Sequence, residues 1–414
     1  MKVTKTLVPT NIGFTKPVET VMEIKTDRIE SIDILRGVVM VIMALDHVRD
    51  YFYFGSFFND PTNLETTTSV LFFTRFITNY CAPVFVFLAG TSAFLYGAKK
   101  SKSELFKFLF SRGLWLIFLE IVVNNFLWTF DFTYSFKIFQ VIWAIGFSML
   151  CLSFLIFLPK KAIFAVGVLL IAGHNLLDGI VMEGQSFQSI IWYLLHQENF
   201  LTLGSDHLVV MKYPLIPWIG LIALGYLFGT FYQKNYDPKL RRKWLLRLGL
   251  GALTFFFIFR GFNIYGDLVP WTLQNTDTNT ILAFFKVTKY PPSLLFLCIT
   301  MGPAMLFLVT FENSKNKLSN FFLVFGRVPL FYYFLHILMI HVLAIIGLLI
   351  FGGNWQDMIL TGESFMAGKL ATYGYSLLTV YLVWIGIVLL LYPLCKLYMQ
   401  YKANNKEKWW LSYL

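Results

Sequence analysis

The amino-acid sequence predicts an all-α polytopic membrane protein with about ten transmembrane helices and both chain ends in the cytoplasm. The first observation is composition: of 414 residues, 57% are hydrophobic and 14% are charged, whereas a soluble domain carries about 25% charged residues. The second is that apolar stretches of roughly 20 residues, the length that crosses a bilayer as a helix, recur along the chain. The third is that lysine and arginine gather in alternate connecting segments, as in multi-pass proteins.

Ten stretches have the length and composition of a membrane-spanning helix. They are residues 34–54, 70–98, 105–128, 134–158, 161–181, 212–233, 244–262, 291–311, 322–351 and 371–399. Residues 187–195 are apolar but too short to cross. We interpret them as an interfacial or re-entrant helix, and an eleventh crossing at this point is the alternative.

The distribution of basic residues predicts the orientation and the location. With ten spans, most lysines and arginines fall on the side that holds both chain ends, which is the cytoplasmic side of an inner membrane. The net charge of +11 fits this signal better than nucleic-acid binding. We expect a cytoplasmic segment at 1–27, a membrane domain at 28–400 and a cytoplasmic tail at 401–414. Residues 1–27 lack the features of a signal peptide, and the sequence leaves a homo-oligomer open.

The first span carries far more ionisable residues than an anchor needs. The stretch from Arg28 to Phe54, which includes this span, reads RIESIDILRGVVMVIMALDHVRDYFYF and contains Asp33 and Arg36 near its start and Asp46, His47 and Asp50 near its end. Ionisable groups inside a bilayer cost a few kcal/mol or more each, so they mark functional sites by default. For Asp33 and Arg36, an (i, i+3) pair that only orients the helix start is the alternative.

The spacing within this span predicts a site that reaches across the membrane. Arg36 and His47 are eleven residues apart, which is three helical turns, so they share a face and lie roughly 16 Å apart along the axis. Arg36 can bind an anion at the cytoplasmic end, and neutral His47 can act as a base near the outer end. Asp46 or Asp50 could orient the imidazole, and we prefer Asp46. The gap is comparable to an extended pantetheine arm.

Other polar residues give weaker signals. Three residues in the outer half of the second span, Arg75, Asn79 and Tyr80, could complete a polar pocket. His174, His336 and His341 are expected to be packed and hydrogen-bonded histidines. The spacing of His174 and Asp178 is weak evidence for a metal, and the four cysteines show no CxxC pair, so we expect no metal and no disulfide framework. The motifs GxSxG, GxGxxG and HExxH and the P-loop are absent.

Several segments together resemble a known family. They are SIDILRGVVMVIMALDHVRDYF, PVFVFLAGTSAFLYG, KYPPSLLFLCITMGP, GRVPLFYYFLHILMIHV and the closing WWLSYL. From about Arg28 to its end, the chain resembles the bacterial branch of the heparan-alpha-glucosaminide N-acetyltransferase-like membrane proteins. The spacing of Arg36 and His47 is also similar to the first span of membrane sugar O-acetyltransferases of the acyltransferase-three group.

This resemblance implies a fold of about ten helices and a transmembrane acyltransferase activity. The donor would be cytosolic acetyl-CoA or another acyl-CoA, and the acceptor an amino or hydroxyl group of a sugar or envelope glycan on the outer side. His47 would be the catalytic histidine, assisted by Asp46 and Asp50, and Arg36 and Arg75 would bind the donor. The segment DHVRDYF departs from the reactive-histidine region of the lysosomal enzyme, so heparan-derived glucosamine is not assumed as acceptor.

Two other functions compete with this interpretation. A proton-coupled solute permease would also place ionisable residues within the membrane, although transporters often do so in paired repeats, and we find no second copy of the cluster. A non-catalytic scaffold or lipid-binding protein would not need the ionisable residues of the first span.

Overall fold

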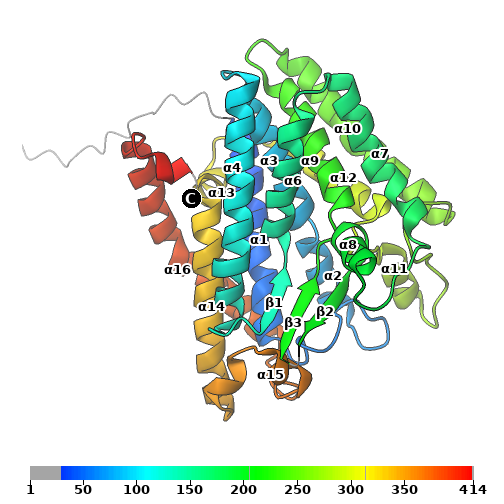
Figure 1. The fold of residues 1–414 in the computed structure, drawn as a ribbon, viewed down its shortest axis with the longest axis vertical. Coiled ribbons are helices and arrows are strands. Elements are labelled where there is room, and N and C mark those ends of the chain that lie inside the picture. Colours follow the sequence, from blue (N-terminus) through cyan, green and yellow to red (C-terminus); the bar gives the residue numbers. More distant parts are fainter. Residues whose placement is uncertain (1–28, 205, 313, 413–414) are drawn as a thin grey trace, which may run out of the picture.

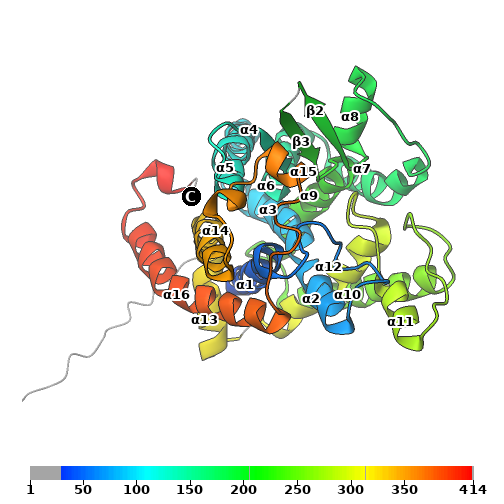
Figure 2. The same ribbon diagram turned by 90° about the horizontal axis from the view of Figure 1, so that it is seen from below.

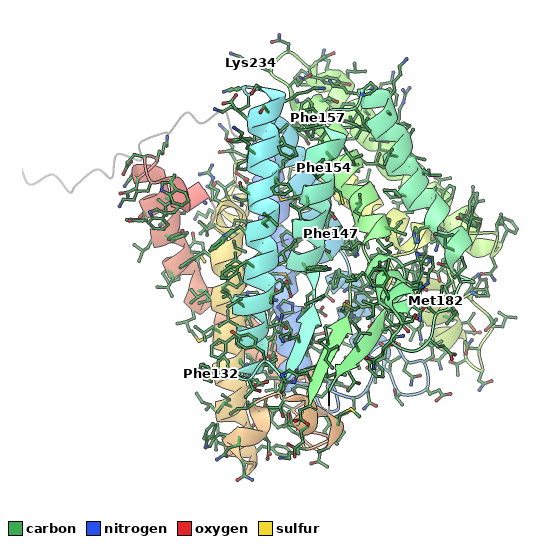
Figure 3. All side chains as sticks on the ribbon, viewed as in Figure 1. Phe132, Phe147, Phe154, Phe157, Met182 and Lys234 are labelled. Atoms are coloured by element: carbon green, nitrogen blue, oxygen red, sulfur yellow. The ribbon has the colours of Figure 1, made fainter. Side chains whose placement is uncertain are left out.

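The computed structural model describes residues 29–204, 206–312 and 314–412. The cytoplasmic segment expected at 1–27 lies outside these residues. The described chain is mostly helical, and its long helices run side by side as a bundle (Figure 1). The lysine-rich turn at Lys234 and the loop at Phe132 mark opposite ends of this bundle (Figure 3).

The connections between the helices differ widely in length. In chain order they are α1 (Glu30–Phe52), α2 (Ser69–Thr78), α3 (Cys81–Gly97), α4 (Lys102–Phe118), α5 (Asn125–Thr129), α6 (Val141–Leu155), α7 (Lys160–Gly173), α8 (Phe187–Leu195), α9 (Ile216–Phe228), α10 (Pro238–Gly261), α11 (Asp277–Phe285), α12 (Leu294–Thr310), α13 (Lys317–Arg327), α14 (Pro329–Phe351), α15 (Gly362–Met366) and α16 (Leu377–Asn404). Each of the ten predicted spans overlaps at least one of these helices, and the short helix predicted at 187–195 is α8.

Five helical segments of the described chain are long and apolar enough to cross a membrane. They are Ser69–Gly97, Lys160–Leu177, Pro238–Gly261, Pro329–Phe351 and Leu377–Asn404. Three shorter apolar helices, α6, α9 and α12, lie among them. The chain is therefore a multi-pass membrane protein by composition and helix length.

The all-α prediction is wrong at the end of the bundle that holds Phe132. Here β1 (Phe136–Phe139), β2 (Asn199–Leu203) and β3 (His207–Met211) form a sheet in the order β1-β3-β2. Strand β3 pairs with β1 in parallel and with β2 in antiparallel register. Short apolar runs do not distinguish a buried strand from a piece of helix, and β1 falls inside the predicted span 134–158. Tyr193 of α8 packs against buried residues of β2 and β3, so this helix covers the sheet.

Several predicted spans also differ in their helix limits. The span 322–351 is two helices, because Val328 between α13 and α14 is not helical and the ring of Pro329 disfavours the helical conformation in the residue before it. The helix in 371–399 starts only at Leu377, where Ser376 accepts a hydrogen bond from Thr379 N. A turn at Asn79 and Tyr80 separates α2 from α3.

Helix α1 lies within the bundle, with α13, α14 and α16 on one side and α2 and α3 nearby (Figure 2). Its closest approach is to α13, where glycines face backbone. A Cβ on Gly37 would lie 1.8 Å from Phe322 O, and a Cβ on Gly326 would lie 1.8 Å from Asp33 O. Small residues allow such close contact between membrane helices, and here they fix the start of the ionisable helix.

We expect Gly326→Ala to destabilise the protein, because its methyl group would collide with the backbone oxygen of Asp33, which cannot rotate away. Overpacking of this kind costs about 1–3 kcal/mol. The measurement is thermal unfolding in detergent. Gly251→Ala in α10 is the matched control, since a Cβ there meets nothing within 4 Å, and equal melting temperatures for the two variants would contradict the prediction.

Candidate active site

His47 is paired with a second histidine from α14. Its Nδ1 lies 2.8 Å from Nε2 of His336, and the two rings are stacked with centroids 5.0 Å apart. Trp128 and Tyr333 contact the ring of His47 edge-on, with centroids 4.9 and 6.0 Å away. His47 is 8% exposed and His336 is fully buried. The pair is therefore held rigidly between α1 and α14.

The hydrogen bonds determine the tautomers of two neutral imidazoles. Nδ1 of His336 lies 2.9 Å from Tyr332 O, and a carbonyl can only accept, so this nitrogen carries the proton. Nε2 of His336 is then an acceptor, and Nδ1–H of His47 donates to it. Nε2 of His47 consequently keeps its lone pair, as a general base or nucleophile requires.

The structure gives Asp46 different partners from those expected. Its Oδ2 lies 2.5 Å from Nη1 of Arg75, its Oδ1 lies 2.8 Å from Nη1 of Arg49, and Thr78 Oγ1 donates to Oδ1 at 2.8 Å. The Nδ1 position at which an orienting carboxylate would bind His47 is taken by His336. Asp46 thus links α1 to α2 by an ion pair with Arg75. It lies next to His47 in the chain but does not bind Nδ1 of that histidine.

Asp50 lies one turn further along α1. Its Oδ1 pairs with Nη2 of Arg49 at 2.6 Å, and its side chain is 37% exposed. Arg49 is almost completely buried and bridges the two carboxylates. The sequence pattern therefore brings the predicted acids together around an arginine.

A cavity of about 770 Å³ opens beside this cluster, and we name it the sheet-side cavity. Asp46, His47, Asp50 and Arg75 line it, together with residues of β1 and β3 and of the segment between α10 and α12. Asn79 also lines it, as expected for a polar pocket between the first two spans. All predicted site residues except Arg36 thus share one cavity.

Several basic and aromatic side chains also line the sheet-side cavity and form one wall of it. Lys212 pairs with Glu198 at 2.5 Å, and the ammonium groups of Lys212 and Lys289 lie 4.5 and 5.3 Å from the ring centre of Tyr290. Burial and the charge of Arg75 lower the pKa of Lys289 below its usual value. The pKa of the Tyr290 hydroxyl is lowered as well, because the nearby cations outweigh the opposing effect of burial.

Arg260 fastens the segment that closes this wall. The buried guanidinium donates to Phe284 O, Val269 O, Ala283 O and Lys286 O at 2.5–3.0 Å. The sequence alone does not show that Arg260 holds this long connection in place, because all four partners of its guanidinium are backbone carbonyls and leave no side-chain signal.

A second cavity of about 420 Å³ lies beside the first half of α1, and we name it the Arg36 cavity. Its cationic residues are Arg36, Arg112, Arg327 and Lys402, and the rest of its lining is mostly apolar. Nη1 of Arg36 pairs with Asp33 at 2.9 Å, and its Nη2 donates to Ser92 Oγ at 3.0 Å. The expected (i, i+3) pair is therefore present, and Arg36 nevertheless lines a cavity.

The two cavities approach each other at the histidine pair. Tyr333 lines the Arg36 cavity and contacts His47, which lines the sheet-side cavity. Met43, one turn before His47, also lines the Arg36 cavity. Arg75 lines only the sheet-side cavity, so of the two arginines expected to bind the donor, Arg36 alone reaches the second cavity.

Sequence reasoning missed the main partner of His47. His336 was expected to be a packed histidine, and it is packed and hydrogen-bonded, but its partner is His47. The segment FYYFLH, which holds Tyr332, Tyr333 and His336 in one turn of helix, was the available signal. No spacing rule connects it with a residue 289 positions earlier.

Two comparisons with known proteins were made to identify the family of the chain. A comparison with curated proteins finds no match. Residues 28–260, more than half of the chain, match the family described as heparan-alpha-glucosaminide N-acetyltransferase, catalytic. The match includes α1 with His47 and Arg36, and the α2 segment with Arg75. The chain therefore belongs to the heparan-alpha-glucosaminide N-acetyltransferase catalytic family.

Proposed function

We propose that this protein transfers an acetyl or other acyl group from cytosolic acyl-CoA to an amino or hydroxyl group of a sugar or envelope glycan on the outer side of the inner membrane. The single observation that carries this proposal is the ring contact between His47, which lines the sheet-side cavity, and Tyr333, which lines the Arg36 cavity. The proposal includes ten spans and cytoplasmic chain ends, which place the Arg36 cavity toward the cytoplasm.

The Arg36 cavity suits the donor. Its cations, Arg36, Arg112, Arg327 and Lys402, can bind phosphate groups of a coenzyme A nucleotide. Its apolar lining, including Met40, Met43 and Ile145, can enclose a pantetheine arm that runs toward Tyr333. Arginine is the usual residue for phosphate recognition because its planar group donates two hydrogen bonds at once.

The chemistry then requires only a base next to the thioester. The acceptor nitrogen or oxygen attacks the thioester carbonyl carbon, Nε2 of His47 takes the acceptor proton, and the carbon–sulfur bond breaks. The proton on His47 passes to the leaving thiolate, so the histidine returns to its starting state. In the competing route, His47 itself carries the acyl group.

The sheet-side cavity suits a sugar acceptor. Sugars stack on aromatic rings and hydrogen-bond to charged side chains, and this cavity offers Trp271, Tyr290 and Trp128 beside Asp46 and Asp50. We assign Arg75 to this side, where it holds Asp46, and the two carboxylates to positions around the acceptor. Asp46 and Asp50 thus remain candidate site residues.

We expect Arg36→Ala to weaken acyl-CoA binding about 10- to 100-fold, because a hydrogen bond to a charged group contributes about 1.5–3 kcal/mol. Calorimetry on the detergent-purified protein measures it. Arg242→Ala is the matched control: this exposed arginine of α10 is absent from the lining of the Arg36 cavity. Its affinity should equal that of the wild type.

The same experiment decides between the two leading functions. Micromolar binding that depends on Arg36 supports the donor site. Folded protein that binds no acyl-CoA would contradict the proposal and would make a proton-coupled permease the leading function, to be tested by solute uptake into proteoliposomes without any acyl donor.

A further inference from the structure

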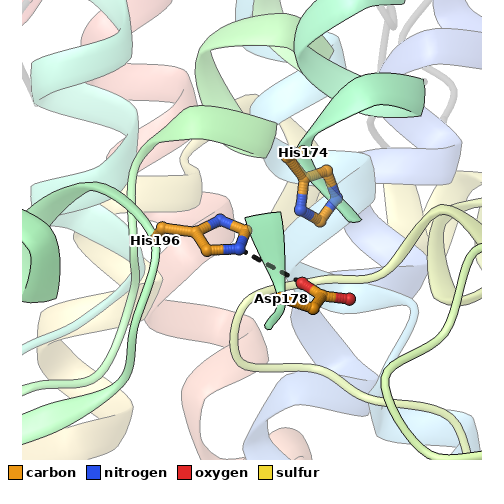
Figure 4. A group of neighbouring side chains, drawn as sticks. All are labelled: His174, Asp178 and His196. Atoms are coloured by element: carbon orange, nitrogen blue, oxygen red, sulfur yellow. Dashed lines mark hydrogen bonds and ion pairs between the residues drawn. The ribbon is translucent and has the colours of Figure 1, made fainter. Parts of the chain in front are cut away.

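We propose that His174, Asp178 and His196 bind one divalent first-row transition metal ion, with Zn²⁺ as the best match. His174 begins the 3-10 turn His174–Leu177 at the end of α7, Asp178 follows this turn, and His196 follows the last residue of α8. Figure 4 shows the three side chains converging from these two segments.

The spacing of the ligand atoms fits a metal. One ring nitrogen from each histidine and one carboxylate oxygen lie within 4.8 Å of one another. Nε2 of His196 is already 3.1 Å from Oδ1 of Asp178. Ligand atoms of tetrahedral zinc lie about 3.3 Å apart, as bond lengths of about 2.0–2.1 Å require, so a small inward movement completes the site.

The burial of His174 is the second, independent observation. This side chain is 2% exposed, and neither of its ring nitrogens makes a hydrogen bond of normal geometry within the described chain. Buried polar groups in proteins almost always have a partner. The backbone of Pro292 lies near the ring, and a backbone acceptor commonly orients the ring N–H of a metal-bound histidine. A metal ion would supply the partner for the other nitrogen.

Two hydrogen bonds through Asn175 hold the Asp178 carboxylate in place. Oδ2 of Asp178 accepts a hydrogen bond from Nδ2 of Asn175 at 2.8 Å, and Oδ1 of Asn175 accepts one from Leu294 N at 3.0 Å. Supporting hydrogen bonds of this kind fix the orientation of metal ligands. They leave Oδ1 of Asp178 directed at His196.

The ligand atoms indicate which metal would bind, and the position of the three residues indicates what the ion would do. Two imidazoles and one carboxylate suit zinc and neighbouring transition metals, whereas Mg²⁺ and Ca²⁺ prefer oxygen ligands. None of the three residues lines the sheet-side cavity or the Arg36 cavity, so the ion would not act in the transfer reaction. It would instead clamp α7 to the end of α8, two residues before Glu198, which lines the sheet-side cavity.

Metal content tests the inference directly. The protein is purified through a tag without histidines, incubated with Zn²⁺, dialysed and measured by mass spectrometry of the elements. We expect about one equivalent of zinc per chain in the wild type and a loss of at least tenfold in His174→Ala and His196→Ala. His207→Ala, which removes an exposed histidine outside the cluster, should retain the metal.

A second measurement covers variants that fail to fold. Wild-type protein stripped with a chelator should melt several degrees lower, and added Zn²⁺ should restore the melting temperature, whereas Asp178→Asn should respond less. Folded wild type that takes up neither Zn²⁺ nor Co²⁺ would overturn the inference and leave a simple hydrogen bond between His196 and Asp178. Both readouts are independent of acyl-CoA binding, so they can fail or succeed separately from the proposed transfer.

Discussion

Replacing His47 by alanine is expected to lower the rate of acyl transfer by about 10²- to 10⁴-fold, the range that a general base contributes. The physical reason is the tautomer of His47: its Nδ1 carries the proton that is donated in the hydrogen bond to His336, so its Nε2 has a free lone pair that can accept a proton. The measurement is release of free coenzyme A with whichever amino- or hydroxyl-bearing sugar acceptor supports transfer by the wild-type protein. Binding of acyl-CoA should persist, because the cations of the Arg36 cavity are unchanged.

Two further variants sharpen this prediction. His207→Ala, at an exposed histidine of β3, should transfer at the wild-type rate. His336→Gln keeps a side chain that can accept from His47, so it should lose less activity than His336→Phe, which cannot. Full activity of folded His47→Ala would refute the assignment of the catalytic residue, and an acyl adduct on His47 in mass spectra would favour the covalent route.

Replacing Asp46 by asparagine is expected to lower the free energy of unfolding by about 3 kcal/mol, because removing one partner of a buried ion pair leaves an uncompensated charge. Here Arg75 would lose its carboxylate partner and Arg49 would keep only Asp50, and the side chains of Arg75 and Arg49 are only 14% and 4% exposed. Chemical or thermal unfolding in detergent measures the loss. Asp50→Asn is the matched control and should cost less than about 1 kcal/mol, because Asp50 is 37% exposed.

A double variant separates charge from packing. If the loss in Asp46→Asn comes from unpaired arginines, then neutralising Arg75 as well, in Asp46→Asn/Arg75→Gln, should recover part of the stability. Equal losses in the single and double variants would show that the ion pair between α1 and α2 is not the cause, and would assign the effect to the hydrogen bond from Thr78 instead.

Much of the fold could be predicted from local sequence patterns, above all from the length of the apolar stretches. Apolar stretches of about 20 residues have few alternatives to a helix in a membrane, and each predicted span does contain helix. The errors lie where local signals are ambiguous. The short apolar sequence of β1, within 134–158, is compatible with either a strand or a helix. Its pairing with β3 also depends on residues about 70 positions away in the chain.

The candidate site also has a part that the sequence predicts and a part that depends on tertiary packing. The sequence by itself determined that α1 carries Arg36 and His47 on one face, since helical periodicity depends only on neighbouring residues. Only the tertiary structure decided that His336 rather than Asp46 binds Nδ1 of His47, and that Asp46 instead pairs with Arg75 and Arg49. It also decided that Tyr333, which lines the Arg36 cavity, contacts His47, which lines the sheet-side cavity. Such contacts arise from the packing of α1 against α2 and α14, and no local rule of spacing encodes which side chains of distant helices will face each other.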